Sequence, residues 1–544
     1  MKKFIIVLLA VATLGLSSCE KWLDVNKNPN DATTTTPYLL LPGMLTSWSS
    51  DVTSLTTLSG AWMGYWTHAG GWSGWYSEKK YEITANYLNL YGYYTGTLAD
   101  NFYIRANSTN NRIYPAITDV VDSWYYARLV DCYGDVPYSE ACQPTLTLTP
   151  KYDDAQTIYR DLITRLDSAM SVFTSWSKAA DKTIPGTTYY FKSNTHDIIF
   201  SGDFLKWRSL ANSLKLRLVM RLTNVLSVAD LRAMVAKTQA YGYITADATG
   251  SPGYSASSGK TNPWWNSFGK SYDGVIVNAT TQYVLNSYFH QKLSNLTDPR
   301  LNQYFWAPSS APGGALKSIP YGTDGDLTVQ PNSTVAANYS FVHIANDWTS
   351  KVTGNGALDR SKIMTYAEVL FLQAEAAQRG IYQVSGLAVD PAPIYTNAVT
   401  ASLNAAKVAA SAQTTYLAQA NVAWNAAETD AMKIARIINQ KYIANYFVNM
   451  FESYCDYRRT GYPNPKDPTL TVEMLSYYPG GVIKRQIPRI FPYPQADYDL
   501  NKINVQAAID KQIQKNGVTF TTNSYPFNGR VFWDTAPAEI PYNY

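Results

Sequence analysis

The feature that most constrains the fold of this chain is a series of amphipathic helical stripes. The clearest stripe has apolar side chains three or four residues apart, at Ile158, Leu162, Leu166, Ala169, Met170 and Phe173. This spacing places them on one face of an α-helix, which Asp153 is expected to cap together with Gln156. Similar patterns predict a helix that begins near Asp203, one over 363–377 that ends at Gly380, and alanine-rich helices over about 393–411 and 428–454.

These predicted helices follow one another in pairs, with alanine where two helices must approach closely. Such pairs are typical of tetratricopeptide-like hairpins, although no clean repeat of about 34 residues is visible. Segments rich in glycine, serine, asparagine and tyrosine at 243–275 and 306–341 predict long ordered loops with short strands. We therefore expect a mainly α fold: a tetratricopeptide-like helical scaffold with an irregular, loop-rich subdomain and a few short strands. The proline-rich C-terminal segment, with little helical periodicity, is expected to wrap around the scaffold.

Residues 1–19 have the pattern of a secretory signal peptide: two lysines, an apolar run from Phe4 to Leu16, then Ser17-Ser18-Cys19. The run is too short to span a bilayer, which takes roughly 20 helical residues. Its end resembles a bacterial lipoprotein lipobox, which implies that Cys19 becomes the first mature residue and carries acyl chains as a permanent anchor. The alternative is an ordinary secreted protein in which Cys19 only falls near the cleavage site. We expect a signal peptide at 1–18, a lipidated tether at 19–36 and one folded unit at 37–544.

Charge and hydropathy exclude two classes of function. The 45 Lys and Arg nearly balance the 41 Asp and Glu, and there is no basic block beyond Lys79-Lys80 or Arg458-Arg459. The chain therefore lacks the electrostatic footprint of a nucleic-acid-binding protein. After the leader no stretch reaches 18 apolar residues, so we expect the mature chain to meet a membrane only through its lipid anchor.

Three cysteines remain after Cys19. An oxidising compartment permits a disulfide between Cys132 and Cys142, but with Cys455 the number is odd and the spacing fits no disulfide framework. We expect free, partly buried thiols, and no metal site, because no Cys/His cluster accompanies them.

Short blocks along almost the whole chain carry a family resemblance. They are WLDVN at 22–26, YGDVPYSEA at 133–141, PKYD at 150–153, ANSLKLRL at 211–218, YAEVLFLQAEA at 366–376, YRRTGYP at 457–463, IPR at 487–489 and VFWD at 531–534. With these blocks in this order after Cys19, the chain resembles the SusD/RagB family of nutrient-binding outer-membrane lipoproteins of the Bacteroidetes. The resemblance implies a tetratricopeptide-like scaffold, no cofactor, and a SusC-like TonB-dependent barrel as partner. It also implies a position on the outer membrane that faces the cell exterior.

Most of these shared blocks have a structural interpretation. The glycine and proline of Tyr133–Pro137 end a helix and turn the chain. Trp207 shares a helix face with Leu214 and Leu218, which favours a core position over a ligand platform. Arg458-Arg459 is a candidate partner for buried carboxylates such as Glu368 or Glu375.

The candidate ligand-binding residues are aromatic. Trp62, Trp66, Trp72, Trp75 and Tyr76 lie close together among glycines, and Trp62 and Trp66 are four residues apart, as on one helix face. Indole and phenol rings offer an apolar face to a sugar ring and a polar edge to its hydroxyls. The alternative is that these rings fill the gap between the scaffold and the loop subdomain.

A second cluster, Trp264-Trp265, lies on the long loop at 243–275. In an extended strand adjacent side chains point to opposite faces, so at most one of these rings would face inward. Ligand contact and core packing both stay open for this pair.

Signatures of an enzyme are poor. The four histidines are far apart without metal-ligand spacing, no GxSxG occurs, and Asp324 and Asp326 are better interpreted as a polar turn than as a calcium loop. Together with the family resemblance, which implies nutrient capture, this predicts a non-enzymatic protein that captures an oligosaccharide and passes it to the barrel. The alternatives are an oligopeptide ligand, a surface glycoside hydrolase, and a structural lid without a ligand of its own.

Overall fold

The computed structural model describes residues 35–68, 76–108, 111–143, 145–177, 196–269, 271–273, 283–308, 313–323, 338–342, 358–477, 486–516 and 525–536. The signal peptide, Cys19 and most of the predicted tether lie outside these residues, as do Asp324 and Asp326. No helix of the described part is both long and apolar enough to cross a bilayer.

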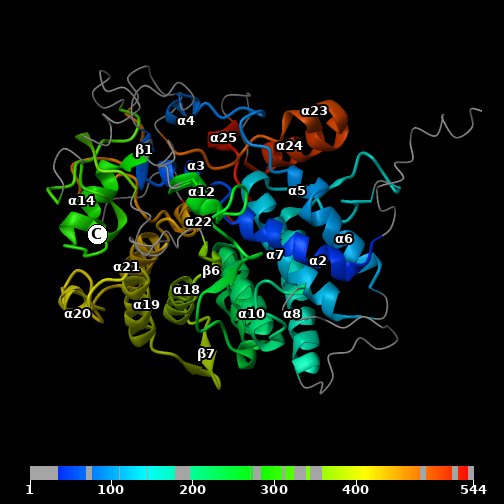
Figure 1. Cartoon of the computed structure of the whole chain (residues 1–544), viewed down its shortest axis with the longest axis horizontal. Coiled ribbons are helices and arrows are strands. Elements are labelled where there is room, and N and C mark those ends of the chain that lie inside the picture. Colours follow the sequence, from blue (N-terminus) through cyan, green and yellow to red (C-terminus); the bar gives the residue numbers. More distant parts are fainter. Residues whose placement is uncertain are drawn as a thin grey trace, which may run out of the picture.

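Helices dominate the architecture (Figure 1). Those of the first half are α2 (Pro37–Asp51), α3 (Thr56–Trp62), α4 (Tyr76–Lys80), α5 (Gly92–Thr95), α6 (Thr97–Ala106), α7 (Ile113–Tyr133), α8 (Ala155–Ser177), α10 (Phe204–Arg221), α11 (Val228–Ala236) and α12 (Pro263–Phe268). Those of the second half are α14 (Ser287–Asn295), α15 (Leu301–Tyr304), α18 (Tyr366–Gln378), α19 (Pro391–Ala405), α20 (Ala410–Leu417), α21 (Asp430–Ala444), α22 (Met450–Thr460), α23 (Gln495–Leu500), α24 (Lys502–Asn516) and α25 (Tyr525–Asn528). Two 3-10 turns, Leu222–Asn224 and Gln239–Tyr241, follow α10 and α11.

The strands are short and pair into two-stranded antiparallel sheets. The pairs are β1 (Trp66–His68) with β5 (Tyr283–Leu285), β2 (Val136–Pro137) with β3 (Tyr152–Asp153), β4 (Ala248–Gly250) with β6 (Ser361–Met364), and β7 (Gln383–Val384) with β8 (Leu387–Ala388).

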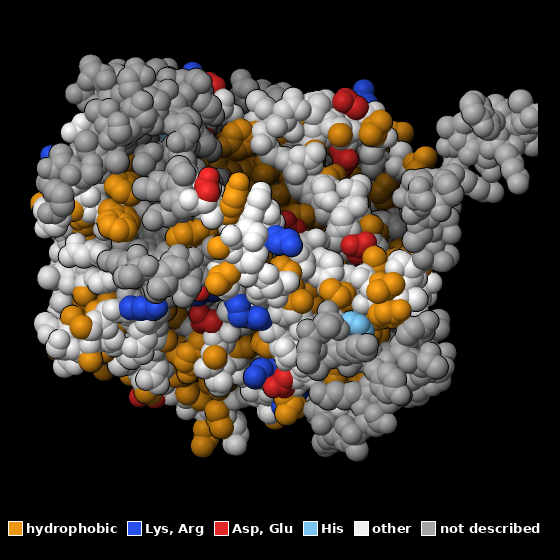
Figure 2. Space-filling model, viewed as in Figure 1, with side chains coloured by type: hydrophobic (Ala, Val, Ile, Leu, Met, Phe, Trp, Pro, Cys, Tyr) orange, Lys and Arg blue, Asp and Glu red, His pale blue; other side chains and the backbone are white. Residues whose placement is uncertain are grey.

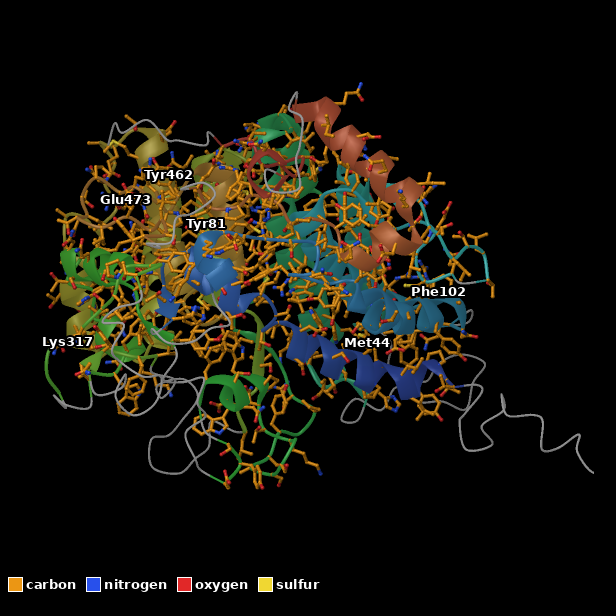
Figure 3. The ribbon with its side chains drawn as sticks, turned by 90° about the horizontal axis from the view of Figure 1, so that it is seen from above. Met44, Tyr81, Phe102, Lys317, Tyr462 and Glu473 are labelled. Carbon is orange, nitrogen blue, oxygen red and sulfur yellow. The ribbon has the colours of Figure 1, made fainter. Side chains whose placement is uncertain are left out.

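The scaffold is an array of neighbouring helices. Helix α7 packs on α8, α8 on α10, α10 on α18, and α18 on both α19 and α21, so the helices stand side by side across the lower part of Figure 1. At one end of the molecule α2 and α6, which carry Met44 and Phe102, lie side by side, and Lys317 marks the opposite end (Figure 3). The predicted helical scaffold with a few short strands is confirmed.

Local signals explain where these helices begin and end. The Asp203 carboxylate accepts a hydrogen bond from the Lys206 amide (3.2 Å) and caps α10, as the sequence predicts. Gly134 (φ +85°) ends α7, and Gly380 (φ +68°) closes α18; glycine adopts these left-handed conformations without strain. The predicted cap of α8 was wrong by one residue. Asp154 accepts from the Thr157 amide (2.9 Å), whereas Asp153 belongs to β3.

Two predicted helices are each broken in two. Lys407 (φ +54°) separates α19 from α20, and Phe447 (φ +62°) lies between α21 and α22. A side-chain pattern does not reveal a single residue in the left-handed region, and such a residue ends an α-helix. The expectation of little helix in the C-terminal segment was also wrong, because α24 covers Lys502–Asn516.

The interior of the scaffold contains charged side chains, which we call the ionic cluster: Asp131, Arg217, Arg221, Glu368, Glu375, Lys441, Glu452, Asp456 and Arg459, all of them buried. Arg459 donates to both oxygens of Glu375 (2.6 and 2.8 Å) and to Asp456 (2.9 Å). Arg217 bonds Glu368 at 2.7 Å, and Arg221 bonds Glu452 at 2.6 Å. Of the two candidate partners of the Arg458-Arg459 block, Glu375 pairs with Arg459, whereas Glu368 pairs with Arg217.

The three described cysteines are free, as expected: Cys132 and Cys455 are buried and Cys142 is half-buried. The alternative of a disulfide between Cys132 and Cys142 was wrong. Burial raises the pKa of the Cys132 thiol to about 12, so it stays protonated at neutral pH.

Candidate functional site

The structure places Trp62 and Trp66 in the interior. Trp62 is the last residue of α3 and stacks on Phe491, with ring centroids 5.6 Å apart and an interplanar angle of 10°. Trp66 is fully buried in β1 and contacts Phe268 and Tyr283. The two tryptophans do not share a helix face, because Gly64 (φ +66°) turns the chain between them.

Trp264 and Trp265 are buried as well, at 1% and 6% exposure. The segment is not extended, so the alternation of a strand does not apply: both residues lie in α12, where the Asn262 side chain caps the helix by accepting from the Trp264 amide (2.8 Å). A short helix, unlike a strand, directs both adjacent rings inward here. In this structure the packing alternative therefore describes Trp62, Trp66, Trp264 and Trp265.

Trp72 and Trp75 lie outside the described residues, and the side chain of Tyr76 is not described either. Ligand contact by these three residues stays a prediction, and so does lipid attachment at Cys19.

Trp66 and Trp264 belong to a larger aromatic cluster in the loop-rich half of the molecule: Tyr65, Trp66, Trp264, Phe268, Tyr283, Phe289, Tyr304, Phe305, Tyr442, Tyr446 and Phe447. Tyr65 stacks on Tyr442 with centroids 4.4 Å apart, and its hydroxyl donates to the Tyr442 carbonyl (2.6 Å). The cluster joins β1, α12 and α14 to the α21–α22 connection, and one edge of it opens into a cavity.

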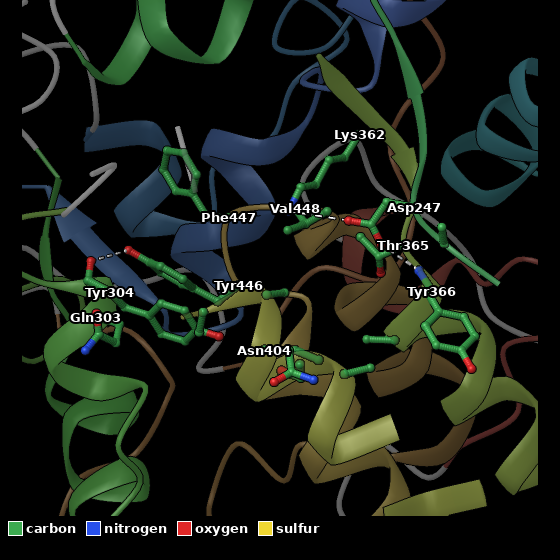
Figure 4. Close-up of a pocket in the computed structure, with 17 residues that line it drawn as sticks. Asp247, Gln303, Tyr304, Lys362, Thr365, Tyr366, Asn404, Tyr446, Phe447 and Val448 are labelled. Carbon is green, nitrogen blue, oxygen red and sulfur yellow. Dashed lines mark hydrogen bonds and ion pairs between the residues drawn. The ribbon is translucent and has the colours of Figure 1, made fainter. Parts of the chain in front are cut away.

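This cavity, the tyrosine pocket, has a volume of about 410 Å³. Its walls come from α15, α18, α19, β6 and the α21–α22 connection, and its main side chains are Asp247, Gln303, Tyr304, Lys362, Tyr366, Asn404, Tyr446 and Phe447. Tyr304 and Tyr366, both half-buried, lie on opposite sides with Asn404 between them (Figure 4). A volume of this size falls in the range of small-molecule sites.

Hydrogen bonds hold the walls of the tyrosine pocket in place. Asp247 accepts from the Tyr366 amide (2.9 Å) at the start of α18 and lies 3.6 Å from the Lys362 ammonium group. The Tyr446 hydroxyl donates to the Tyr304 carbonyl (3.2 Å). Burial, and then the neighbouring Tyr304, raise the pKa of Tyr446, so its phenol stays neutral. The pocket therefore combines aromatic faces with amide, hydroxyl and paired charged groups.

The pocket lacks the groups for glycoside hydrolysis. Asp247 is the only carboxylate among its described lining residues, and it pairs with Lys362. Hydrolysis of a glycosidic bond generally takes two carboxyl groups that flank the bond. Among the described residues no cluster of three or more His, Cys, Asp or Glu could hold a metal ion.

An exposed tryptophan, Trp306, was missed by the sequence analysis. Trp306, two residues after Tyr304, is 42% exposed and lies nearly parallel to Phe341, with centroids 6.3 Å apart. Phe305 bridges to Val342 and points inward, so alternation along the extended chain directs Trp306 outward. A signal was present in the sequence, because Phe305 and Trp306 are adjacent bulky aromatics at the start of the predicted loop at 306–341.

A second cavity of about 370 Å³ lies between α14, α21 and the segment that follows α22. Its lining includes the amides of Asn295, Asn421, Asn439, Gln440 and Asn464, charged groups of both signs, and Tyr462, which is labelled in Figure 3. Charges of both signs are also interspersed on the face shown in Figure 2. Among the described residues of that face, no concentration of charges of one sign marks a site for a highly charged ligand.

Comparison with known proteins identifies the family. A family model described as starch-binding and associating with the outer membrane, the SusD-like family, matches residues 29–494. The chain belongs to the SusD-like family. No curated protein matches it.

Solved SusD homologues share the fold over nearly their whole length. A homologue from Bacteroides uniformis has 25% identity and a TM-score of 0.70, covering 91% of this chain and 99% of the homologue. One from Bacteroides fragilis has 21% identity and a TM-score of 0.69, with coverages of 92% and 99%. A chitin-binding SusD homologue from Flavobacterium johnsoniae has 22% identity and a TM-score of 0.69, again with coverages of 92% and 99%.

The blocks behind the resemblance hold this SusD-like fold together. The Asp135 carboxylate accepts from the Ala155 amide (2.8 Å) at the start of α8. Trp207 is fully buried and donates its indole N–H to Asp197 (2.8 Å). Both positions are structural, as the sequence analysis predicted for most of the shared blocks.

Proposed function

We propose that this protein is a non-enzymatic, cell-surface lipoprotein that captures an oligosaccharide and delivers it to a SusC-like TonB-dependent barrel of the outer membrane. The lipid anchor is on Cys19, residues 19–36 are the tether, and the unit at 37–544 binds the ligand. The observation that carries the proposal is the family match over residues 29–494, in a family described as starch-binding and associating with the outer membrane. The chitin-binding relative supports a glycan ligand.

The side chains of the tyrosine pocket can bind a sugar. Tyr304 and Tyr366 offer aromatic faces to the C–H face of a sugar ring. Gln303 and Asn404 carry amides that both donate and accept hydrogen bonds, as sugar hydroxyls do. Trp306, Trp72 and Trp75 are further candidates for stacking on a longer chain. The single paired carboxylate supports binding rather than hydrolysis.

Isothermal titration calorimetry of the soluble mature chain tests the proposal, with maltoheptaose, chitohexaose and a panel of tri- and tetrapeptides as ligands. We expect heat with at least one glycan and none with the peptides. Tyr366→Ala should weaken glycan binding about tenfold or more, which corresponds to about 1.4 kcal/mol. Alanine at both Trp72 and Trp75 should abolish binding while the unfolding temperature stays nearly unchanged.

Tyr103→Ala on α6 is the matched control, because it removes a half-buried tyrosine at the other end of the molecule and should leave affinity unchanged. Heat with the peptides alone would contradict the oligosaccharide ligand. Release of reducing sugar that depends on a carboxylate would contradict the non-enzymatic function.

A further inference from the structure

An exposed aliphatic patch lies where two distant segments of the chain meet. Its four members are the side chains of Leu146 (65% exposed), Leu148 (84%), Leu500 (77%) and Ile503 (84%). The first two are in the loop before β3, and the other two flank the junction of α23 and α24. Single exposed leucines are common on protein surfaces. Here four large aliphatic side chains are exposed on two segments that are hydrogen-bonded to each other, and such a concentration indicates an interaction surface.

The patch is held in shape by two asparagines. Asn501 donates to the Pro150 carbonyl at 2.8 Å, a contact between residues 351 positions apart in the sequence, and Asn504 donates to the Thr149 carbonyl at 3.1 Å. These bonds fix the loop that carries Leu148 against the turn that carries Leu500 and Ile503. The exposed side chains therefore do not belong to a loosely attached loop, and a partner would find the patch preformed.

The surroundings of the patch have the anatomy of a protein interface. Lys151 lies 3.9 Å from Glu140, and Lys511 forms ion pairs with Asp135 and Asp154 at 2.7 Å. Protein interfaces combine an apolar centre with such a polar rim. A surface that rests on anionic lipid would instead be rich in Lys and Arg alone, so charges of both signs favour a protein partner.

The start of the described chain indicates which way the patch faces. Thr35 accepts a hydrogen bond from the Tyr103 hydroxyl of α6 (2.9 Å), so the tether leaves the folded body there. Both Figure 1 and Figure 3 show α6 at the same end of the molecule as α23 and α24. From Cys19 to Thr35 the chain reaches at most about 55 Å. A lipid on Cys19 would therefore hold Thr35, and with it this end of the body, within about 55 Å of the membrane and of the proteins embedded in it.

We propose that Leu146, Leu148, Leu500 and Ile503 form the surface through which this protein docks on its outer-membrane barrel, at the end of the body from which the tether leaves. The inference rests on the proposed function for the identity of the partner. It adds the place of contact and its chemistry: the barrel presents an apolar extracellular surface with charged groups of both signs around it.

The test is affinity purification of the tagged, lipidated protein from detergent-solubilised outer membranes of its own host, with mass spectrometry to identify and quantify a TonB-dependent barrel. The variant carries Leu148→Ser and Ile503→Ser. The matched control is Leu387→Ser on β8, which is 72% exposed at a distant hairpin. We expect at least a tenfold loss of barrel with the double variant and wild-type recovery with the control. Thermal unfolding should be unchanged in both, because the replaced side chains are exposed.

Equal recovery of the barrel with the double variant and the control would overturn the proposal. A second outcome would also overturn it. If the unlipidated protein floated with phosphatidylcholine–phosphatidylglycerol vesicles, and the double variant no longer floated but still recovered the barrel, the patch would face lipid and not the barrel. Glycan calorimetry on the same proteins separates this inference from the proposed function. Intact glycan binding with unchanged barrel recovery refutes the patch alone, whereas no glycan binding in the wild type refutes the capture function.

Discussion

The scaffold and the loop-rich half of this molecule have interiors of different chemistry. In the scaffold, the ionic cluster joins α10, α18, α21 and α22 through bonds such as the two from Arg459 to Glu375. In the loop-rich half, the aromatic cluster joins short elements through ring contacts such as Tyr65 on Tyr442. Buried charges require particular partners at particular distances, whereas aromatic rings pack in several orientations.

The difference suggests a division of tasks. The ionic cluster fixes one arrangement of the long helices, because any other arrangement leaves a buried charge unpaired. The aromatic cluster fills the space under long loops without strict geometry, and the tyrosine pocket opens at its edge. Substitutions in the loops can therefore be accommodated by repacking of the aromatic cluster, while the arrangement of the scaffold helices stays the same.

The largest effect is expected from the ionic cluster. Arg459→Met leaves Glu375 without its main partner and removes one of the two cations that pair with Asp456, the other being Lys441. The loss of one member of a buried pair costs about 3–5 kcal/mol. Urea unfolding followed by circular dichroism at 222 nm should show this loss. Arg160→Met, which replaces an exposed arginine on α8, is the control. A loss below 1 kcal/mol would show that the two clusters do not differ in the way we describe.

Acid should weaken the scaffold first. Burial opposes the ionisation of Glu375, but Arg459 and Arg379 outweigh it and lower its pKa to about 2; Arg221 and Arg217 do the same for Glu452. A folded-state pKa below the usual value of about 4.3 stabilises the protein above that value, and this contribution disappears as the pH falls through the folded-state pKa. The urea midpoint should therefore fall between about pH 5 and pH 2, and less steeply in Arg459→Met. A flat midpoint over this range would contradict the prediction.

The smallest effect is expected from the aromatic cluster. Phe268 is buried against Trp66, Trp264, Tyr283 and Phe447. Phe268→Leu keeps the site apolar and nearly filled, so the free energy of unfolding should fall by only about 1 kcal/mol. The same urea measurement applies. A loss as large as that of Arg459→Met would show that the aromatic side is as strictly determined as the ionic one.

The sequence predicted the scaffold well because its signals are local. The stripe that includes Ile158 and Leu162, the cap at Asp203 and the stop at Gly380 each depend on residues within a few positions of one another. The breaks at Lys407 and Phe447 were missed, because a left-handed residue that is not glycine has no local signature. The family resemblance was recognisable because its blocks occur in order along the chain.

The candidate site was far less predictable. Clustering of tryptophans in the sequence does not distinguish a ligand platform from a core, and burial, which decides this for Trp62 and Trp264, depends on contacts with Phe491 and Phe447 from distant segments. The tyrosine pocket combines Tyr304, Tyr366 and Asn404 from three separate helices or their ends. No spacing of residues along the chain predicts that these three side chains lie near one another. The exposed Trp306 was accessible to sequence reasoning through alternation with Phe305.

The free thiols of the scaffold have a practical consequence. Cys132 on α7 and Cys455 on α22 are fully buried, and both have pKa values raised by burial. A maleimide reaches these two thiols only when the helices separate. The rate of labelling therefore measures the rate at which the scaffold opens. The half-buried Cys142 reports on a different, peripheral segment. Cys132 and Cys455 are thus two native probes of the unfolding rate, and their labelling can be followed on a denaturing gel without an introduced cysteine.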